Sequence, residues 1–188
     1  MIQKNLQHQR ELKALQRAVR CGEQDLCYFD EAGFSLTPSV PYGWQPIGER
    51  LEIPSSKSRQ LNVLGFLDYR GNGFAPYVVE GCVDAATVIA CMDSFCDTIT
   101  KPTTVVIDNA PVHTSGLFQS MIPSWEERNL YLWFLPPYSP ELNLIEILWK
   151  KIKYQWLPIE AYESFACLSE QLCYILANIG KQFSICLQ

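Results

Sequence analysis

The sequence predicts an α/β domain with a mixed five-stranded sheet and helices on both faces. Five short apolar segments have the composition of strands, and amphipathic segments of helical period separate the later ones. Three predicted strands come first, and each of the last two follows a predicted helix. This order, with two further helices at the end, is typical of a sheet layered between helices.

The strands are expected in five apolar runs at residues 25–34, 61–68, 74–79, 103–108 and 130–135. The glycine-containing segment 69–73 predicts a hairpin turn between the second and third strands. Pro76 has no backbone N–H to donate to a sheet ladder, so the third strand is expected at the sheet edge. The proline- and glycine-rich stretch after the first strand predicts a long hairpin loop.

Helices are expected at residues 2–20, 85–99, 142–156 and 163–179. Asp84 is placed to cap the second of these helices, and Gly22 and Gly180 are placed to end the first and the last. Between the fourth and fifth strands, the helical pattern is expected to be irregular. Pro123 predicts an interruption there, and Ser124 begins a capping-box pattern that predicts a restart.

The bulk composition fits one folded domain preceded by a helix. A chain of 188 residues with 48% hydrophobic and 12% aromatic residues can bury a substantial core. Residues 1–24 are predicted to form a connector helix with a narrow apolar stripe, and residues 25–188 the domain itself. The sequence has no uninterrupted run of about 18 apolar residues, so a membrane span is not expected. The N-terminus lacks the apolar core of a signal peptide, so an intracellular, cytoplasmic location is expected.

Cysteine and histidine usage argues against a zinc site. The chain has eight cysteines, none in a Cys-x-x-Cys pair, and two histidines. Zinc motifs need closely spaced ligands, and a disulfide framework needs a secreted protein. The sequence therefore predicts reduced, buried thiols.

The net charge of −5 argues against a freestanding DNA-binding module, because neutralising phosphates normally requires a basic surface. The same charge is compatible with a nuclease-type catalytic core. Such a core holds acidic ligands and can take its DNA affinity from another domain. Composition alone leaves this question open.

Two apolar runs stop on an aspartate, and a later helix carries a glutamate. Asp30 follows the apolar run at 26–29, Asp108 follows the run at 104–107, and Glu146 lies on the predicted helix at 142–156. Ligands of open α/β sheets gather at the carboxyl ends of the strands. Bare carboxylates repel one another, and a divalent cation removes that repulsion. The three acids therefore predict a metal site.

Each acid also has an ordinary structural interpretation. Asp30 could be a simple strand-end residue, and its neighbour Glu31 competes for the same role, although alternation along a strand points the two side chains to opposite faces. Glu146 could form only a surface ion pair with Lys150 or Lys153. Glu141 is a competing acid on the same segment, but its place before the helix predicts a cap.

Three carboxylates without histidine or thiolate partners favour Mg²⁺ or Mn²⁺ over zinc. Two such ions can activate the attacking oxygen and stabilise the leaving oxygen of a phosphodiester. Four nearby residues are candidates for DNA contact: Trp44, His113, Lys150 and Lys153. His113 could instead contact a carboxylate or pack its loop, the lysines could line a solvated helix face, and Trp44 could hold its own loop.

Four segments carry a resemblance to a known family. They are residues 29–34 (FDEAGF), 43–48 (GWQPIG), 107–113 (IDNAPVH) and 135–149 (LPPYSPELNLIEILW). In this order they resemble the catalytic domain of mariner-like insertion-sequence transposases, which belong to the DDE superfamily of ribonuclease H-like enzymes. The last two segments are the more specific. Leu144 departs from the pattern, since it stands where the family usually has proline.

The resemblance implies a ribonuclease H-like fold and assigns Asp30, Asp108 and Glu146 to the metal-binding acidic triad. It implies cleavage at transposon ends and transfer of the freed 3′-hydroxyl to target DNA, with a DDE catalytic domain at 25–188. The expected partners are DNA and either a separate helix-turn-helix portion or a second copy of the chain. The alternatives are a structure-specific nuclease without strand transfer and a non-catalytic domain that interacts with or inhibits a full-length transposase.

Overall fold

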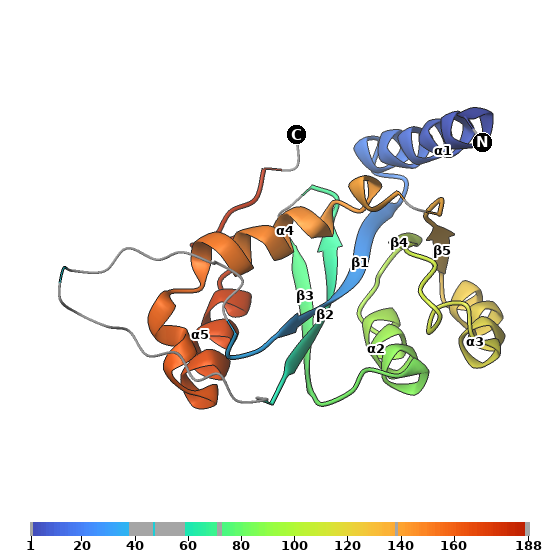
Figure 1. Cartoon of the computed structure of the whole chain (residues 1–188). Helices are drawn as coiled ribbons and strands as arrows, with labels where there is room; N and C mark the ends of the chain where they lie inside the picture. Colours follow the sequence, from blue (N-terminus) through green and yellow to red (C-terminus); the bar gives the residue numbers. More distant parts are fainter. Residues whose placement is uncertain (1, 38–46, 48–58, 71–72, 138, 187–188) are drawn as a thin grey trace.

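A five-stranded mixed sheet forms the centre of the protein (Figure 1). The computed structural model describes residues 2–37, 47, 59–70, 73–137 and 139–186. The strands are β1 (Asp25–Phe34), β2 (Leu61–Asp68), β3 (Phe74–Glu80), β4 (Thr103–Ile107) and β5 (Leu130–Phe134), in the spatial order β3-β2-β1-β4-β5. β1, β2 and β3 pair antiparallel, whereas β4 is parallel to both β1 and β5. The predicted sheet is confirmed, with Pro76 on edge strand β3.

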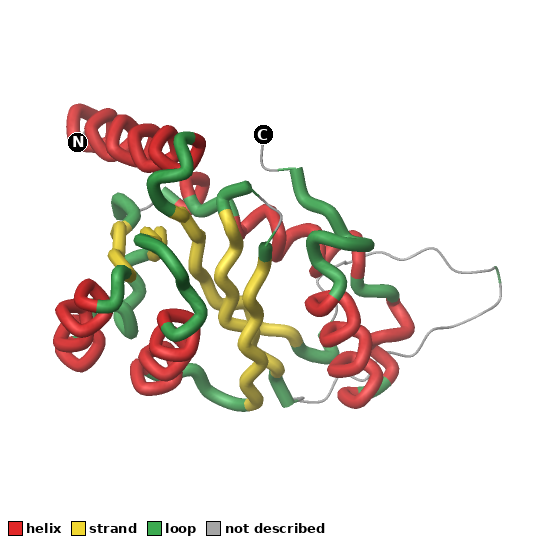
Figure 2. The backbone as a smooth tube through the Cα atoms, turned by 180° about the vertical axis from the view of Figure 1, so that it is seen from behind, coloured by secondary structure: helices red, strands yellow, loops and turns green. Residues whose placement is uncertain are grey.

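Helices cover both faces of this sheet, as predicted (Figures 1 and 2). On one side lie α2 (Ala85–Cys96) and α3 (Gly116–Glu127). On the other lie α4 (Ile145–Lys151) and α5 (Phe165–Ala177), and α1 (Ile2–Arg20) joins the same core through Leu12 and Val19. Short helical turns complete the chain: η1 (Pro140–Leu142), η2 (Ile152–Trp156) and η3 (Ile159–Glu163).

Alternation along β1 divides the interior into two cores. Tyr28 packs with the α4 and α5 side, whereas its neighbour Phe29 packs with the α2 and α3 side. Successive side chains of a strand point to opposite faces, so the next two residues divide in the same way. Asp30 therefore faces α4, and Glu31 faces α2 and α3.

The structure corrects the expected interruption at Pro123. α3 runs without a break from Gly116 to Glu127 and contains Pro123. Its cap is Ser115, whose hydroxyl accepts a hydrogen bond from the Phe118 N–H, and Ser124 caps nothing. A proline inside a helix removes one hydrogen bond, but α3 fully buries Phe118 and Trp125. Burial of two large aromatic side chains outweighs that loss.

The predicted helix at 142–156 is a composite. A 3₁₀ turn (η1) precedes α4, and the π-helical turn η2 follows it. The expected cap by Glu141 is wrong, because no side chain caps α4 and Leu144 is the residue at its N-cap. Leu144 has helical backbone angles (φ −65°, ψ −19°), so the absence of proline there does not prevent the turn.

The expectation for the cysteines is partly wrong. All eight are free, but only Cys27, Cys91 and Cys96 are buried. Cys21, Cys82, Cys173 and Cys186 are exposed. Within the described part of the chain, no helix is long and apolar enough to cross a membrane.

Gly65 makes room for the packing of α4 on the sheet. It lies opposite Asp30 in the β1–β2 ladder, and directly opposed residues share a face. A Cβ at this position would lie 2.6 Å from the Phe74 ring and 3.0 Å from the Trp149 ring. These rings pack edge to face with their centroids 5.8 Å apart. The missing side chain therefore allows Trp149 to lie over the strand beside Asp30.

Gly65→Ala should destabilise the protein by about 1–3 kcal/mol, because the added methyl group overpacks the Phe74 and Trp149 rings. Urea unfolding followed by circular dichroism measures the change. Gly116→Ala is the matched control, since a Cβ there meets no atom within 4 Å. Equal stability of the two variants would contradict the close packing at Gly65.

Candidate active site

Asp30 lies in the middle of β1, and its side chain faces α4. One of its carboxylate oxygens, Oδ2, accepts a hydrogen bond of 3.1 Å from the indole N–H of Trp149 in α4. Burial raises the pKa of Asp30, and the negative charges of Glu31 and Glu146 raise it further. With a smaller contribution from the charge of Asp108, the pKa reaches about 7.

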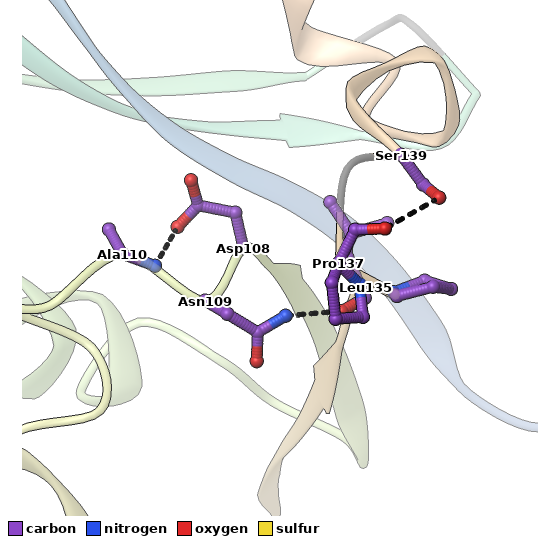
Figure 3. A pocket seen from close by; sticks show the side chains of 7 residues that line it. Asp108, Asn109, Ala110, Leu135, Pro137 and Ser139 are labelled. Carbon is purple, nitrogen blue, oxygen red and sulfur yellow. Dashed lines mark hydrogen bonds between the residues drawn. The ribbon is translucent and has the colours of Figure 1, made fainter.

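Asp108 lies just beyond the carboxyl end of β4 and lines an open pocket of about 460 Å³ (Figure 3). Its Oδ1 accepts two hydrogen bonds: 2.9 Å from the Ala110 N–H and 2.7 Å from His113 Nδ1. The bond from His113 lowers the pKa of Asp108, against the opposing effect of burial. Asp108 is thus held as a carboxylate, and 47% of its side chain remains exposed.

Glu146 belongs to the first turn of α4, which two contacts fasten to β1. The Asn143 side-chain amide donates to the Phe29 carbonyl at 3.1 Å, and the Trp149 indole donates to Asp30. Glu146 lies three residues before Trp149 on α4, so these two side chains share one side of the helix, and the Glu146 backbone N–H donates to the Asn143 carbonyl at 3.1 Å. This arrangement brings Glu146 to the Asp30 side of the sheet.

The three predicted acids come from β1, the end of β4 and α4. They lie close enough for the charges of two of them to act on the third. The charges of Glu146 and Asp108 both raise the pKa of Asp30. Among the described residues, however, no group of three His, Cys, Asp or Glu side chains is arranged tightly enough to hold a metal ion. Carboxylates without a cation repel one another, so a looser spacing is expected of them.

His113 is buried between two carboxylates. Its side chain is fully buried, with Nδ1 2.7 Å from Asp108 and Nε2 2.9 Å from Glu31. Burial lowers the pKa of His113, but the hydrogen bonds and charges of both carboxylates outweigh it and raise the pKa to about 9. Of the interpretations open from sequence, the contact with a carboxylate is the one that the structure contains.

Among the other DNA-contact candidates, Lys150 is exposed at the end of α4. The ammonium group of Lys153 lies over the Phe34 ring, 5.3 Å from its centroid. In the described part of the chain, no ion pair joins Glu146 to either lysine, so the surface ion pair considered from sequence is not formed. Trp44 lies outside the described residues.

Two features were missed from sequence, one at the site and one on α1. Glu31 and His113 interact although they lie 82 residues apart, and no local pattern signals such a contact. The second feature is a row of exposed basic side chains on α1, at Arg10, Lys13, Arg17 and Arg20. Their spacing of three, four and three residues is visible in the sequence and places them on one side of a helix.

The raised pKa of Asp30 predicts a specific pH dependence of stability. Between about pH 4 and pH 7 the folded protein holds a proton on Asp30 that the unfolded chain has released, so the free energy of unfolding falls as pH rises through this range. Asp30→Asn cannot titrate. It should therefore be more stable than the parent at pH 8 by on the order of 1–4 kcal/mol, with little difference at pH 4.

Urea unfolding at both pH values in the presence of a chelator measures this difference. Glu141→Gln is the control, since Glu141 is exposed on η1. A stability difference between Asp30→Asn and the parent that is the same at both pH values would contradict the electrostatic cluster.

Comparison with known proteins agrees with the fold. The family model described as DDE superfamily endonuclease matches residues 25–169. Structures of Mos1 transposase are similar: the paired-end complex with left transposon end has a TM-score of 0.64 at 16% identity, covering 90% of this chain and 53% of that one. The Mos1 mariner paired-end complex with Mn has a TM-score of 0.58 at 17% identity, covering 81% and 48%.

The chain thus spans about half the length of the structures that it matches. No curated protein matches it by sequence. The similarity to Mos1 confirms the ribonuclease H-like fold that the sequence motifs implied. Because the family model covers most of the sequence, including all five strands and α4, the chain belongs to the DDE superfamily endonuclease family.

Proposed function

We propose that this chain is the catalytic domain of a DNA transposase, which cuts DNA strands and joins them with the help of divalent cations. The observation that carries the proposal is that the Trp149 indole, one turn after Glu146 on α4, donates to Asp30 at 3.1 Å, while β4, the strand paired with β1, ends just before Asp108. Family membership supports it, and so do the similar structures, which are Mos1 complexes with a transposon end and in strand transfer.

The donor atoms suit Mg²⁺ or Mn²⁺. Asp30, Asp108 and Glu146 supply only carboxylate oxygens, which hard divalent cations prefer. His113 is not available as a ligand, because both its ring nitrogens contact carboxylates. Similar structures of Mos1 are described with Mn and with Mg, which supports the same choice here.

In this proposal two cations bound by the three acids would activate the attacking oxygen and stabilise the leaving oxygen of a phosphodiester. A cation held beside Asp30 would favour its carboxylate form, since a nearby positive charge stabilises the ionised acid. Asp108 offers Oδ2, because its Oδ1 already accepts two hydrogen bonds. The open pocket beside Asp108 leaves room for the substrate.

The basic row on α1 is the second part of the proposal. Buried Leu12 and Val19 fix α1 to the core, and a hollow of about 230 Å³ on its surface is lined by Lys13, Gln16, Arg17 and Arg20. In a chain of net charge −5, such a row is suited to contact DNA phosphates. That residues 1–24 connect to a helix-turn-helix portion, or that two copies act together, stays a prediction.

Purified protein with Mn²⁺ or Mg²⁺, supplied with a helix-turn-helix portion, should nick DNA that carries the element's own ends and join the freed 3′-hydroxyl to a target. Asp30→Asn, Asp108→Asn and Glu146→Gln should each reduce both products by about 100-fold or more, since even residues that only support metal ligands contribute 10–100-fold. Glu141→Gln on exposed η1 is the control.

Gel analysis of the products separates the alternatives. Cleavage without joined molecules would indicate a nuclease that lacks strand transfer. Absence of divalent-cation binding in calorimetry, together with triad variants that behave like the parent, would indicate a non-catalytic interaction domain.

The double variant Lys13→Gln/Arg17→Gln should bind duplex DNA more weakly and with a smaller salt dependence. Each lost phosphate contact lowers the slope of log affinity against log salt by about 0.9. Fluorescence anisotropy at several salt concentrations measures this slope. Arg59→Gln/Lys181→Gln removes two exposed positive charges elsewhere and is the matched control. The same slope for both double variants would exclude the α1 row as a phosphate contact.

A further inference from the structure

His113, the buried histidine between Glu31 and Asp108, has no direct role in the proposed metal chemistry. Its Nε2 lies 2.9 Å from Glu31 Oε1, and its Nδ1 lies 2.7 Å from Asp108 Oδ1. Carboxylate oxygens of ionised acids only accept hydrogen bonds, so the ring donates at both nitrogens. One imidazole therefore joins a residue of β1 to the acid at the end of β4.

The surroundings of His113 prevent the ring from turning away. Its backbone N–H donates to the Ala110 carbonyl at 2.9 Å, and its own carbonyl accepts from the Gln119 side chain at 2.8 Å. The Phe29 and Phe118 rings both pack against the imidazole, and the centroid of each lies 5.7 Å from the imidazole centroid. The ring is thus fixed by its loop, by α3 and by β1.

This fixed ring determines which oxygen of Asp108 is free. Oδ1 receives the His113 and Ala110 donors together, and no hydrogen bond to Oδ2 occurs among the described residues. Rotation of the carboxylate would break two hydrogen bonds at once. Asp108 is therefore held in one orientation, with Oδ2 available to an incoming ligand.

We propose that Glu31 is a positioning residue, which acts through His113 to hold Asp108 in the orientation that binds the cation. The inference rests on the proposed function, in which Asp108 is a metal ligand. It also assigns different roles to two adjacent acids. Asp30 faces α4 and is a metal ligand in the proposed site. Glu31 faces α2 and α3 and contacts His113 there. Contacts of this kind orient metal ligands in many sites.

The first test is a proton NMR spectrum of the metal-free protein. The chain has only two histidines, so His8→Gln leaves His113 as the sole source of imidazole signals. Two slowly exchanging ring N–H resonances are expected in this background. Adding Glu31→Leu should remove the Nε2–H resonance by exposing it to exchange. Absence of both resonances in the folded protein would overturn the inference.

The second test is Mn²⁺ binding measured by calorimetry. Glu31→Leu should weaken Mn²⁺ binding by about 10–100-fold, with much of the cleavage rate restored at saturating Mn²⁺. Glu31→Gln keeps an oxygen that accepts from Nε2–H, so its affinity should stay closer to the parent than that of Glu31→Leu. Glu80→Leu, an exposed acid on strand β3, is the matched control and should bind like the parent. Thermal unfolding verifies that each variant is folded.

The outcomes separate the two proposals. If the parent binds no Mn²⁺, the proposed metal site itself fails. If the parent binds and folded Glu31→Leu binds equally well, only the positioning role fails. If Glu31→Leu and Glu31→Gln both lose binding as completely as Asp108→Asn, then Glu31 is a ligand, and the positioning role is again overturned.

Discussion

The candidate site depends on keeping several negative charges close together where β4 ends beside the middle of β1. Asp30, Glu31 and Asp108 follow from the pairing of β1 with β4, and Glu146 is added by α4. Charges of one sign at short range oppose folding, and the pKa of about 7 for Asp30 reflects that cost. His113 compensates part of it by donating to two of the acids. Clusters of this kind, with a perturbed pKa, mark candidate functional sites.

The attachment of α4 to β1 converts this charge cluster into a site. Trp149 reaches Asp30 across 119 residues of sequence, and Asn143 reaches the Phe29 carbonyl across 114. Gly65 contributes by having no side chain where the Trp149 ring packs. The position of Glu146 is therefore set by packing and hydrogen bonds on both sides of it, without an ion pair of its own among the described contacts. A rigid support of this kind is what a metal ligand requires.

Much of the architecture could be predicted from sequence, because strands and helices leave local patterns. The five strands agree with the predicted runs to within one residue at each end, since alternation and turn residues mark them. The opposite directions of Asp30 and Glu31 also follow from strand geometry alone. Pro123 was misjudged because the local rule against proline in helices carries no information on the buried Phe118 and Trp125. Tertiary packing determined that helix.

The contacts within the site were harder to predict than the residues that form it. The apolar runs that stop on Asp30 and Asp108, and the predicted helix that carries Glu146, indicated the three acids, but not the histidine that joins Asp108 to Glu31. A bond such as that from His113 to Glu31 depends on the relative placement of two segments, which only the folded chain defines. The exposure of four cysteines was missed for the same reason. Sequence periodicity indicates which face of a helix or strand is apolar, but not which residues pack against that face.

The central claim is that Asp30, Asp108 and Glu146 share a divalent cation. The most direct measurement is an anomalous difference map from crystals soaked in Mn²⁺. The account predicts a peak in contact with oxygens of Asp30 and Asp108, with Glu146 drawn toward it and Glu31 still bound to His113. Mn²⁺ bound only at Glu31, or no peak near the three acids at a saturating concentration, would contradict it.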